Sequence, residues 1–179
     1  TPYKALEVDD LRQYIEKAIL QMINKNCTRI KFSIRYKNII DQYNAGGSEN
    51  QDYYEKLLEL IKELQSEQTR ADSLGLNEEE LEIYDLLCQD RNLTKAEEQK
   101  VILAAKNLYQ KLYDKKDELW VVDWYKDEQP RQRVLNMISS TLNEDLPQSY
   151  DREVFTAKSN LLLSHFIDMA IQQYGWFVA

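Results

Sequence analysis

Few residues in this chain have the type and spacing needed for catalysis. The chain contains a single histidine, His165, so a catalytic triad or histidine-based metal site would have to be built around one imidazole. The glutamates at 78–80 and Glu82 form a cluster that could bind a metal ion. Three of them occupy a predicted helix start, however, where negative charge stabilises the helix dipole. We interpret the cluster as a stabilised first turn and predict no catalytic and no metal-binding residue.

The motifs that bind nucleotides are also missing. The sequence contains neither the GxxxxGK[ST] pattern of a phosphate-binding loop nor the GxGxxG pattern of a dinucleotide site. We therefore expect this chain to use no cofactor and not to be an enzyme by itself. An enzyme whose site combines scattered carboxylates with His165 remains an alternative, and it would require a cleft with at least two convergent polar groups.

Charge is distributed unevenly along the chain. The net charge is −8, yet residues 17–40 contain six basic residues and no acidic one. A local basic patch on an acidic protein can follow a phosphate backbone or an acidic partner surface. The alternative is a basic face that only contacts solvent. The candidate contact residues are Lys17, Lys25, Arg29, Lys31, Arg35 and Lys37.

The elements that position these residues are expected to be helices. Only four glycines and three prolines interrupt 179 residues, so long helices can run unbroken. We predict an all-α fold of about seven helices with short connectors, forming a single domain over residues 1–179. Cys27 and Cys88 have no CxxC spacing and fit reduced thiols in the cytoplasm. The apolar runs are too short to cross a membrane.

Helix boundaries follow from apolar spacing and capping residues. The first helix is expected to begin at Asp9 or Asp10, and residues 28–36 alternate as a short extended segment would. Gly75 is expected to end a helix in the left-handed conformation. Asp127 and Asp151 are expected to cap later helices. Three capping boxes are predicted, at Ser48 with Gln51, Asn77 with Glu80, and Thr94 with Glu97.

Aromatic residues near the end of the chain are candidates for docking onto another protein. Buried aromatic anchors carry much of the energy of many interfaces. The alternative for each is packing in the core of its own chain, because aromatic side chains bury well wherever they lie. The candidates are Trp120, Trp124, Tyr125, Trp176 and Phe177.

Six segments in order resemble one family. They are KNIIDQYNAGGS (37–48), YYEKLLELIKEL (53–64), GLNEEELEIYDLL (75–87), LTKAEEQKV (93–101), VVDWYKDEQPRQRV (121–134) and LPQSYDREVFTAKSNLLLSHF (146–166). In order and spacing these segments resemble the C-terminal helical region of the R subunit of type I restriction enzymes, over residues 28–170. The second glycine of the GGS run and Lys31 depart from the family pattern, which commonly has one glycine and an acidic residue there.

The resemblance implies a place in a large enzyme. The parent R subunit would be a type I site-specific deoxyribonuclease with ATP-dependent translocase activity, using ATP and magnesium in nuclease and motor domains outside this chain. This chain would be a non-catalytic C-terminal helical domain. Its partners would be the methyltransferase and specificity subunits, the motor domains of its own polypeptide and duplex DNA, with no membrane. The alternative is an autonomous nucleic-acid-binding helical module that acts through residues 17–40.

Overall fold

The computed structural model describes residues 2–47 and 49–173. Over these residues it has eight α-helices, one 3-10 helix and no strand, so the predicted all-α fold is confirmed. Backbone contacts divide the chain into two compact units, Thr1–Glu78 (unit 1) and Glu79–Ala179 (unit 2). The single domain over residues 1–179 stays a prediction.

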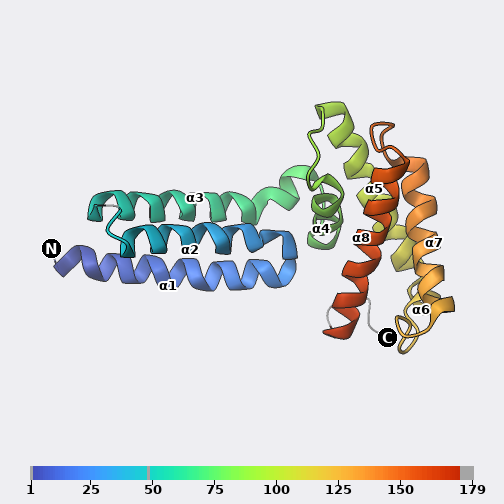
Figure 1. Ribbon diagram of the computed structural model, residues 1–179, viewed down its shortest axis with the longest axis horizontal. Helices are drawn as coiled ribbons and strands as arrows, with labels where there is room; N and C mark the ends of the chain where they lie inside the picture. Colours follow the sequence, from blue (N-terminus) through green and yellow to red (C-terminus); the bar gives the residue numbers. More distant parts are fainter. Residues whose placement is uncertain (1, 48, 174–179) are drawn as a thin grey trace. The chain divides into compact units, whose positions relative to one another are not determined.

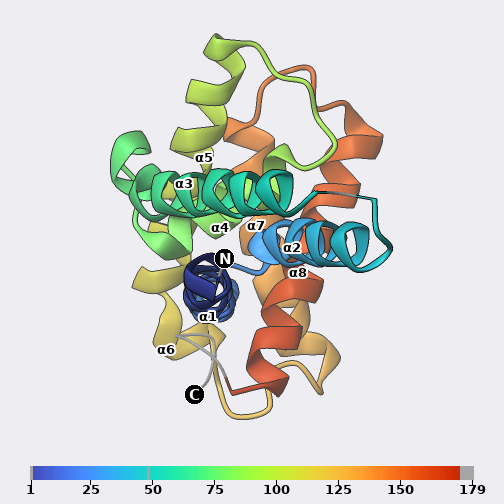
Figure 2. The same cartoon turned by 90° about the vertical axis from the view of Figure 1, so that its left-hand side faces the viewer.

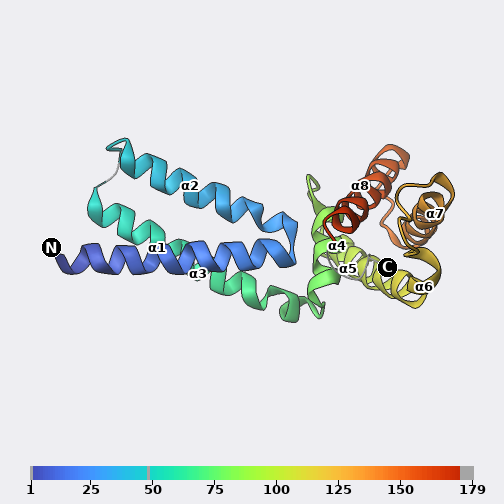
Figure 3. The same cartoon turned by 90° about the horizontal axis from the view of Figure 1, so that it is seen from below.

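Unit 1 contains three long helices and one short one. The helix α1 spans Pro2–Lys25, η1 spans Cys27–Arg29, α2 spans Ile30–Asn44 and α3 spans Asn50–Leu74. Figures 1 and 3 show α1, α2 and α3 running side by side, and Figure 2 views α1 and α2 nearly end on. Their inner faces form one apolar core. Its buried members are Ile15, Ala18, Ile19, Met22, Phe32, Ile39, Tyr53, Leu57, Leu60 and Leu64.

Two predictions for unit 1 were wrong. The helix α1 begins at Pro2, about two turns before Asp9, because proline is well tolerated in a first turn and Val8 extends the apolar stripe toward the N-terminus. The extended segment at 28–36 is absent, since η1 leads directly into α2. The alternation there misled because Ile30 and Ile34 face solvent, with 51% and 57% of their surface exposed.

Unit 2 is built around three long helices. The helix α4 spans Glu78–Cys88 and starts at the boundary residue, α5 spans Lys95–Asp114, α6 spans Lys116–Leu119, α7 spans Glu128–Asp145 and α8 spans Arg152–Ile171. The helix α7 packs between α5 and α8. On α5, Val101, Ala105, Leu108 and Leu112 are buried at helical spacing and Tyr113 is exposed, and on α7 Leu135 is partly exposed. The core comprises Ile83, Leu86, Leu87, Val101, Ala105, Leu108, Leu112, Leu119, Trp120, Trp124, Val134, Ile138, Leu142, Tyr150, Leu162, Phe166 and Ala170.

Three of the predicted helix ends are confirmed, one through backbone hydrogen bonds and two through side-chain caps. Gly75 ends α3 with φ of 69°, and the amides of Gly75 and Leu76 donate to the carbonyls of Asp72 and Ala71, which is a Schellman motif. Asp151 accepts from the amide of Val154 at the start of α8. Both hydrogen bonds of the box at Thr94 and Glu97 are present.

The other predicted caps have different outcomes. Asp127 is the N-cap residue of α7, but its side chain makes no cap hydrogen bond. Ser48 lies outside the described residues, and the N-cap of α3 is Glu49, which has no side-chain cap hydrogen bond. The box at Asn77 and Glu80 stays a prediction.

Replacing Thr94 by alanine should lower the free energy of unfolding of unit 2 by about 1 kcal/mol. The Thr94 hydroxyl accepts from the amide of Glu97 over 3.2 Å, and alanine would leave that amide without its cap. Urea denaturation followed by circular dichroism would measure the loss. Thr94→Ser retains the hydroxyl and should remain close to the wild type; equal losses for serine and alanine would contradict the role of the cap.

Candidate functional site

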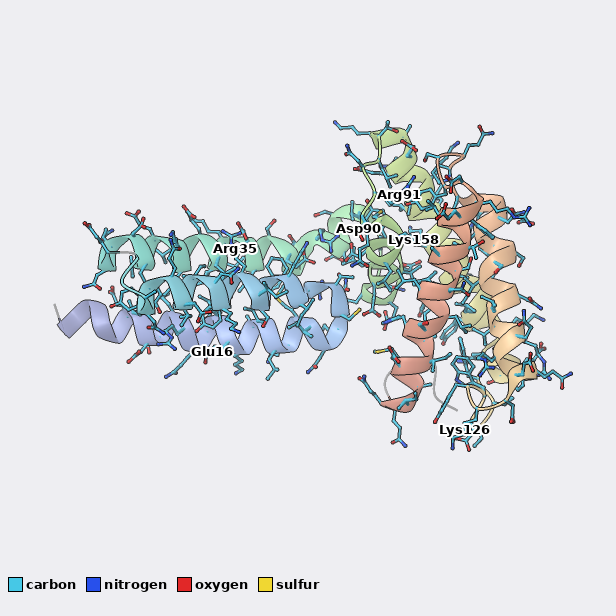
Figure 4. The ribbon with its side chains drawn as sticks, in the orientation of Figure 1. Glu16, Arg35, Asp90, Arg91, Lys126 and Lys158 are labelled. Atoms are coloured by element: carbon cyan, nitrogen blue, oxygen red, sulfur yellow. The ribbon has the colours of Figure 1, made fainter. Side chains whose placement is uncertain are left out.

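The predicted basic contact residues differ in exposure. Lys17 and Lys25 on α1 and Lys31 and Lys37 on α2 are exposed. Arg35 is 42% exposed and forms an ion pair with Glu63 of α3. Figure 4 labels Arg35 on the side of α2 that faces α3. Four lysines therefore present positive charge to solvent, whereas the charge of Arg35 is offset by its neighbour.

Arg29 is buried and does not belong to this exposed surface. Its guanidinium is 2% exposed, and its Nε lies 3.0 Å from Oε1 of Glu67, which is itself 5% exposed. Its Nη1 lies 2.9 Å from Oε2 of Glu78. Arg70 donates to Glu67 from the solvent side. In this structure the charge of Arg29 is paired inside unit 1, so Arg29 adds nothing to the exposed basic surface, and its contact with DNA or an acidic partner stays a prediction.

The ionisation of Glu67 follows from this cluster. Burial acts to raise the pKa of Glu67, but the hydrogen bonds and charges of Arg70 and Arg29 outweigh it and hold the pKa below its ordinary value. Glu67 is therefore a carboxylate at neutral pH, placed between two guanidinium groups. The Glu67 carboxylate binds the guanidinium groups of both Arg29 and Arg70, and its contact with Arg29 holds α3 against η1.

Tyr36 occupies the middle of the basic segment and faces α1. Its hydroxyl donates to Glu16 over 2.7 Å and accepts from Nε of Arg12 over 3.4 Å. Burial, followed by the hydrogen bond to Glu16, raises the pKa of Tyr36 to about 12. The phenol therefore stays protonated and serves as a bridge between two helices.

Two of the five predicted docking aromatics, Trp120 and Trp124, are core residues. Trp120 and Trp124 are 3% and 1% exposed and meet edge to face, with ring centroids 5.1 Å apart. Trp120 also packs against Phe166 of α8. Both rings fill the core of unit 2, as in the alternative of core packing, and their docking onto another protein stays a prediction. Tyr125 is partly buried. The predictions for Trp176 and Phe177 lie outside the described residues.

Two polar residues of the motif at 146–166 bind the C-terminal end of α4 in unit 2. The hydroxyl of Tyr150, just before α8, donates to the carbonyl of Leu87 over 2.7 Å. Lys158 donates to the carbonyls of Leu86 and Gln89, over 2.9 and 2.7 Å. Leu86 and Leu87 lie in the last turn of α4 and Gln89 directly follows it, and the carbonyls at the end of a helix have no partner within the helix. The ammonium group of Lys158 therefore caps the C-terminal end of α4.

Arg91, in the connector between α4 and α5, also contacts the segment just before α8. Its Nη2 donates to the carbonyl of Ser149 over 2.7 Å, and its guanidinium stands 4.9 Å from the ring centroid of Tyr150. Ser149 in turn donates to Glu97, whose pKa is lowered first by this hydrogen bond and then by Thr94. Figure 4 labels Arg91 and Lys158 in this region. Ser149, Tyr150 and Lys158 belong to the motif at 146–166 and Glu97 to the motif at 93–101, whereas Arg91 lies between two motifs; the sequence gave no sign that these residues contact one another.

Replacing Tyr150 by phenylalanine should lower the free energy of unfolding of unit 2 by about 1–3 kcal/mol, because the buried carbonyl of Leu87 would lose its donor. Burial raises the pKa of Tyr150, so the lost group is a protonated hydroxyl at neutral pH. Thermal and urea unfolding would measure the effect. The control Tyr113→Phe alters a ring that is 41% exposed and should change stability by less than about 0.5 kcal/mol. Equal effects at the two positions would contradict this role.

His165 is used in packing within unit 2. Its Nε2 lies 2.8 Å from Oε1 of Glu82, and both side chains are buried. A cavity of about 510 Å³ lies elsewhere, between the end of α7 and the start of α8. It is lined by Leu142, Asn143, Leu146, Pro147, Gln148, Tyr150, Arg152, Phe155 and Thr156. Neither His165 nor any carboxylate lines it, so it lends no support to an enzyme built from those groups.

The fold and these contacts define an all-α protein of two helical units, in which polar motif residues hold helix connectors together. The chain belongs to the family described as type I restriction enzyme HindI endonuclease subunit-like, C-terminal, whose model matches residues 1–164. The resemblance seen in the sequence is thereby confirmed.

A relative from Methanocaldococcus jannaschii carries the provisional name type I restriction enzyme MjaIXP endonuclease subunit. It is 29% identical over 108 residues, which cover 55% of this chain and 10% of the relative. The aligned part therefore spans about a tenth of that protein. No solved structure matches this chain. Among the described residues, no helix is long and apolar enough to cross a membrane.

Proposed function

We propose that this chain is a non-catalytic helical module that assembles the motor subunit of a type I restriction enzyme with its methyltransferase and specificity subunits. The observation that carries the proposal is the use of polar motif residues inside the fold. Tyr150 and Lys158, from the motif at 146–166, bind the backbone carbonyls of Leu87 and Leu86. Ser149 of the same motif donates to Glu97 of the motif at 93–101. Residues that bind neighbouring segments in this way hold the helices and connectors in one arrangement. A module that docks onto another subunit needs such a fixed surface.

The catalytic chemistry would lie in other parts of the parent polypeptide. Nuclease and ATP-dependent translocase activities, with their ATP and magnesium, would belong to domains outside these residues. This chain would contact the motor domains of its own polypeptide and would support translocation by holding the complex together. The protein would work in the cytoplasm, where the DNA of the cell is accessible.

Deleting residues 1–164 from the full-length subunit should abolish assembly with the cognate methyltransferase complex. Size-exclusion chromatography and pull-down with a tagged methyltransferase would measure complex formation. Binding of a fluorescent ATP analogue by the deleted subunit would show that the motor domains remain folded. If the deleted subunit retains ATP-analogue binding and still assembles at wild-type affinity, the assembly function is wrong.

A second function, direct contact with DNA, is favoured by one specific observation. Lys17, Lys25, Lys31 and Lys37 are exposed within a segment that contains no acidic residue. Each phosphate contact made by a lysine contributes about 0.9 to the slope of log affinity against log salt concentration. A surface that uses all four would therefore give a steep salt dependence.

Replacing the four lysines by glutamine in the assembled enzyme should flatten this salt slope for duplex DNA. A matched control replaces Lys95, Lys100, Lys111 and Lys115, which are exposed on or beside α5 in unit 2. Fluorescence anisotropy over a salt series would measure both slopes. An equal change in the two variants would contradict a contact specific to residues 17–40.

A further inference from the structure

The helix α2 carries large apolar residues on two opposite sides. Phe32 and Ile39 point inward and are 8% exposed in the core of unit 1. Ile30 and Ile34 point outward, with 51% and 57% of their surface exposed. In Figure 3, α1 and α3 lie on one side of α2, and no other described helix of unit 1 covers the opposite side. A helix with apolar residues all round is normally buried, so we expect a partner on the outer side.

The two isoleucines form one continuous surface with two lysines. Residues three or four positions apart are neighbours on a helix, so Ile34 lies one turn after Ile30, and Lys37 one turn after Ile34. Lys31 stands on the other side of the isoleucines, with its Nζ 5.3 Å from the ring centroid of Phe32. Both lysines are exposed. We define the outer face of α2 as Ile30, Lys31, Ile34 and Lys37.

The helix α1 adds an exposed leucine beside the outer face of α2. Tyr36 donates to Glu16 of α1 over 2.7 Å, and the short η1 joins α1 to α2 so that the two helices run in opposite directions. Leu20, one turn after Glu16, therefore lies beside the residues about one turn before Tyr36. Its side chain is 65% exposed. Three large aliphatic side chains are thus exposed in this part of unit 1, whereas exposed apolar residues that need no explanation are scattered singly.

Positive charge borders the two isoleucines. Within one turn of either of them, between residues 26 and 38, the chain contains no acidic residue. Arg29 is buried and Arg35 is partly exposed, and both are paired with carboxylates. Lys31 and Lys37 therefore supply the exposed charge of the outer face of α2.

The carboxylates that bond to α2 from its neighbours come with bases of their own. Glu63 of α3 is paired with Arg35. Glu16 and Arg12 of α1 both bond to the hydroxyl of Tyr36, so their charges offset each other. These contacts leave the two exposed lysines of the outer face without compensation from α1 or α3.

Exposed acidic residues further along the helices do not reverse this charge. Asp41 is the first acidic residue after Lys37, and it offsets at most one of the two lysines. On α3, Glu59 and Lys62 are both exposed and offset each other. A positive surface of this kind is complementary to carboxylates.

The exposed aliphatic side chains decide between an acidic protein and DNA at this face. Lysine binds a phosphate and a carboxylate equally well in electrostatic terms, but an isoleucine is stabilised only where apolar surface covers it. Most contacts of proteins with DNA are hydrogen bonds to phosphates and sugars, which offer an isoleucine no such cover. The combination of isoleucine with lysine therefore favours a protein surface.

We propose that the outer face of α2 docks onto an apolar patch bordered by aspartate or glutamate on the methyltransferase or specificity subunits. The inference rests on the assembly function proposed above and names the surface and the partner chemistry. For Lys31 and Lys37, this contact takes the place of the contact with DNA.

The first test uses the full-length subunit and its methyltransferase complex without DNA, with affinity measured by biolayer interferometry. Ile30→Ser combined with Ile34→Ser should weaken association by roughly tenfold or more, because each variant removes apolar surface that the partner would cover. Circular dichroism should show unchanged helix content, since both side chains are exposed. The matched control is Leu103→Ser on α5, which is 59% exposed and should leave the affinity unchanged.

A second set of variants tests the charge. Lys31→Glu combined with Lys37→Glu should also weaken association, and the weakening should diminish as salt screens the charges. Lys31→Arg combined with Lys37→Arg keeps both charges and should retain the wild-type affinity. The control Lys95→Glu combined with Lys100→Glu reverses two exposed lysines of α5 and should have no effect.

DNA binding by the assembled enzyme separates the two occupants of this face. Fluorescence anisotropy with duplex DNA, at subunit concentrations that saturate the methyltransferase complex, should give equal affinities for the wild type and the variant with both glutamates. If that variant assembles normally and loses DNA affinity, the outer face of α2 binds DNA and the inference is wrong.

Other results would also overturn the inference. If the wild-type subunit assembles and the serine and glutamate variants assemble equally well, this face is not the docking surface, while the assembly function stands. Equal weakening by the α5 controls would show that the loss is not specific to α2. A change in the sedimentation mass of the subunit alone would assign the isoleucines to contact with a second copy. If deletion of residues 1–164 leaves assembly intact, the assembly function and this inference both fail.

Discussion

Replacing Trp124 by alanine is expected to remove about 3–5 kcal/mol from the free energy of unfolding of unit 2. The side chain is 1% exposed and packs edge to face against Trp120 and Tyr125. Alanine would leave a cavity in the core of unit 2 that the surrounding backbone cannot fully close. The loss is a large fraction of the stability of a domain of this size.

Hydrogen exchange of amides in α5 and α7 would measure this loss within unit 2, since the most protected amides report the full unfolding free energy. Trp124→Phe retains an aromatic ring and should cost clearly less than alanine. The control Val122→Ala, at an exposed position, should change protection by less than about 0.5 kcal/mol. Unchanged protection in the Trp124→Ala variant would show that the ring does not hold unit 2 together.

Replacing Glu67 by alanine is expected to destabilise unit 1 by about 3–5 kcal/mol, because it leaves the buried guanidinium of Arg29 without its main partner. Glu63→Ala provides a matched control one turn earlier on α3. It breaks the ion pair with Arg35, which is partly exposed, and should cost less than about 1 kcal/mol. Exchange protection in α1 and α3 would measure both. Similar costs for the two variants would contradict a special role for the buried cluster.

The same carboxylate links the stability of unit 1 to pH. The pKa of Glu67 in the folded chain is lower than its ordinary value of 4.5. Its contribution to stability is therefore fully present above that ordinary value and is lost as the pH falls through the lower, folded pKa. Glu67→Gln should be less stable than the wild type at neutral pH, and the difference should shrink on acidification.

Local sequence signals predicted three helix ends correctly. Thr94 with Glu97, Asp151 and Gly75 act through neighbours within a few residues, so the sequence contains all the information that their caps require. The start of α1 was placed too late, and Asp127 makes no cap hydrogen bond. The family resemblance was confirmed over most of the chain.

Long-range pairing could not be predicted in the same way. Arg29 was interpreted as a surface charge, since nothing local indicates that Glu67, 38 residues away, lies beside it. Lys158 is separated by 72 residues from the carbonyl of Leu86 that it caps. The segment at 28–36 resembled a strand because its apolar residues alternate with polar ones. Two of these apolar residues, Ile30 and Ile34, are exposed on a helix. The partners of Arg29 and Lys158 are distant in the sequence, and only folding brings them near.

The two cysteines differ in a way that labelling experiments can use. Cys27 is exposed, whereas Cys88 is partly buried at the end of α4, and burial raises its pKa to about 11. The thiolate is the form that reacts with alkylating reagents, so Cys88 should react slowly until the end of α4 opens. One alkylation time course followed by mass spectrometry would therefore record two processes. The fast phase would report simple access to solvent, and the slow phase would report how often the junction formed by Lys158 and Tyr150 comes apart.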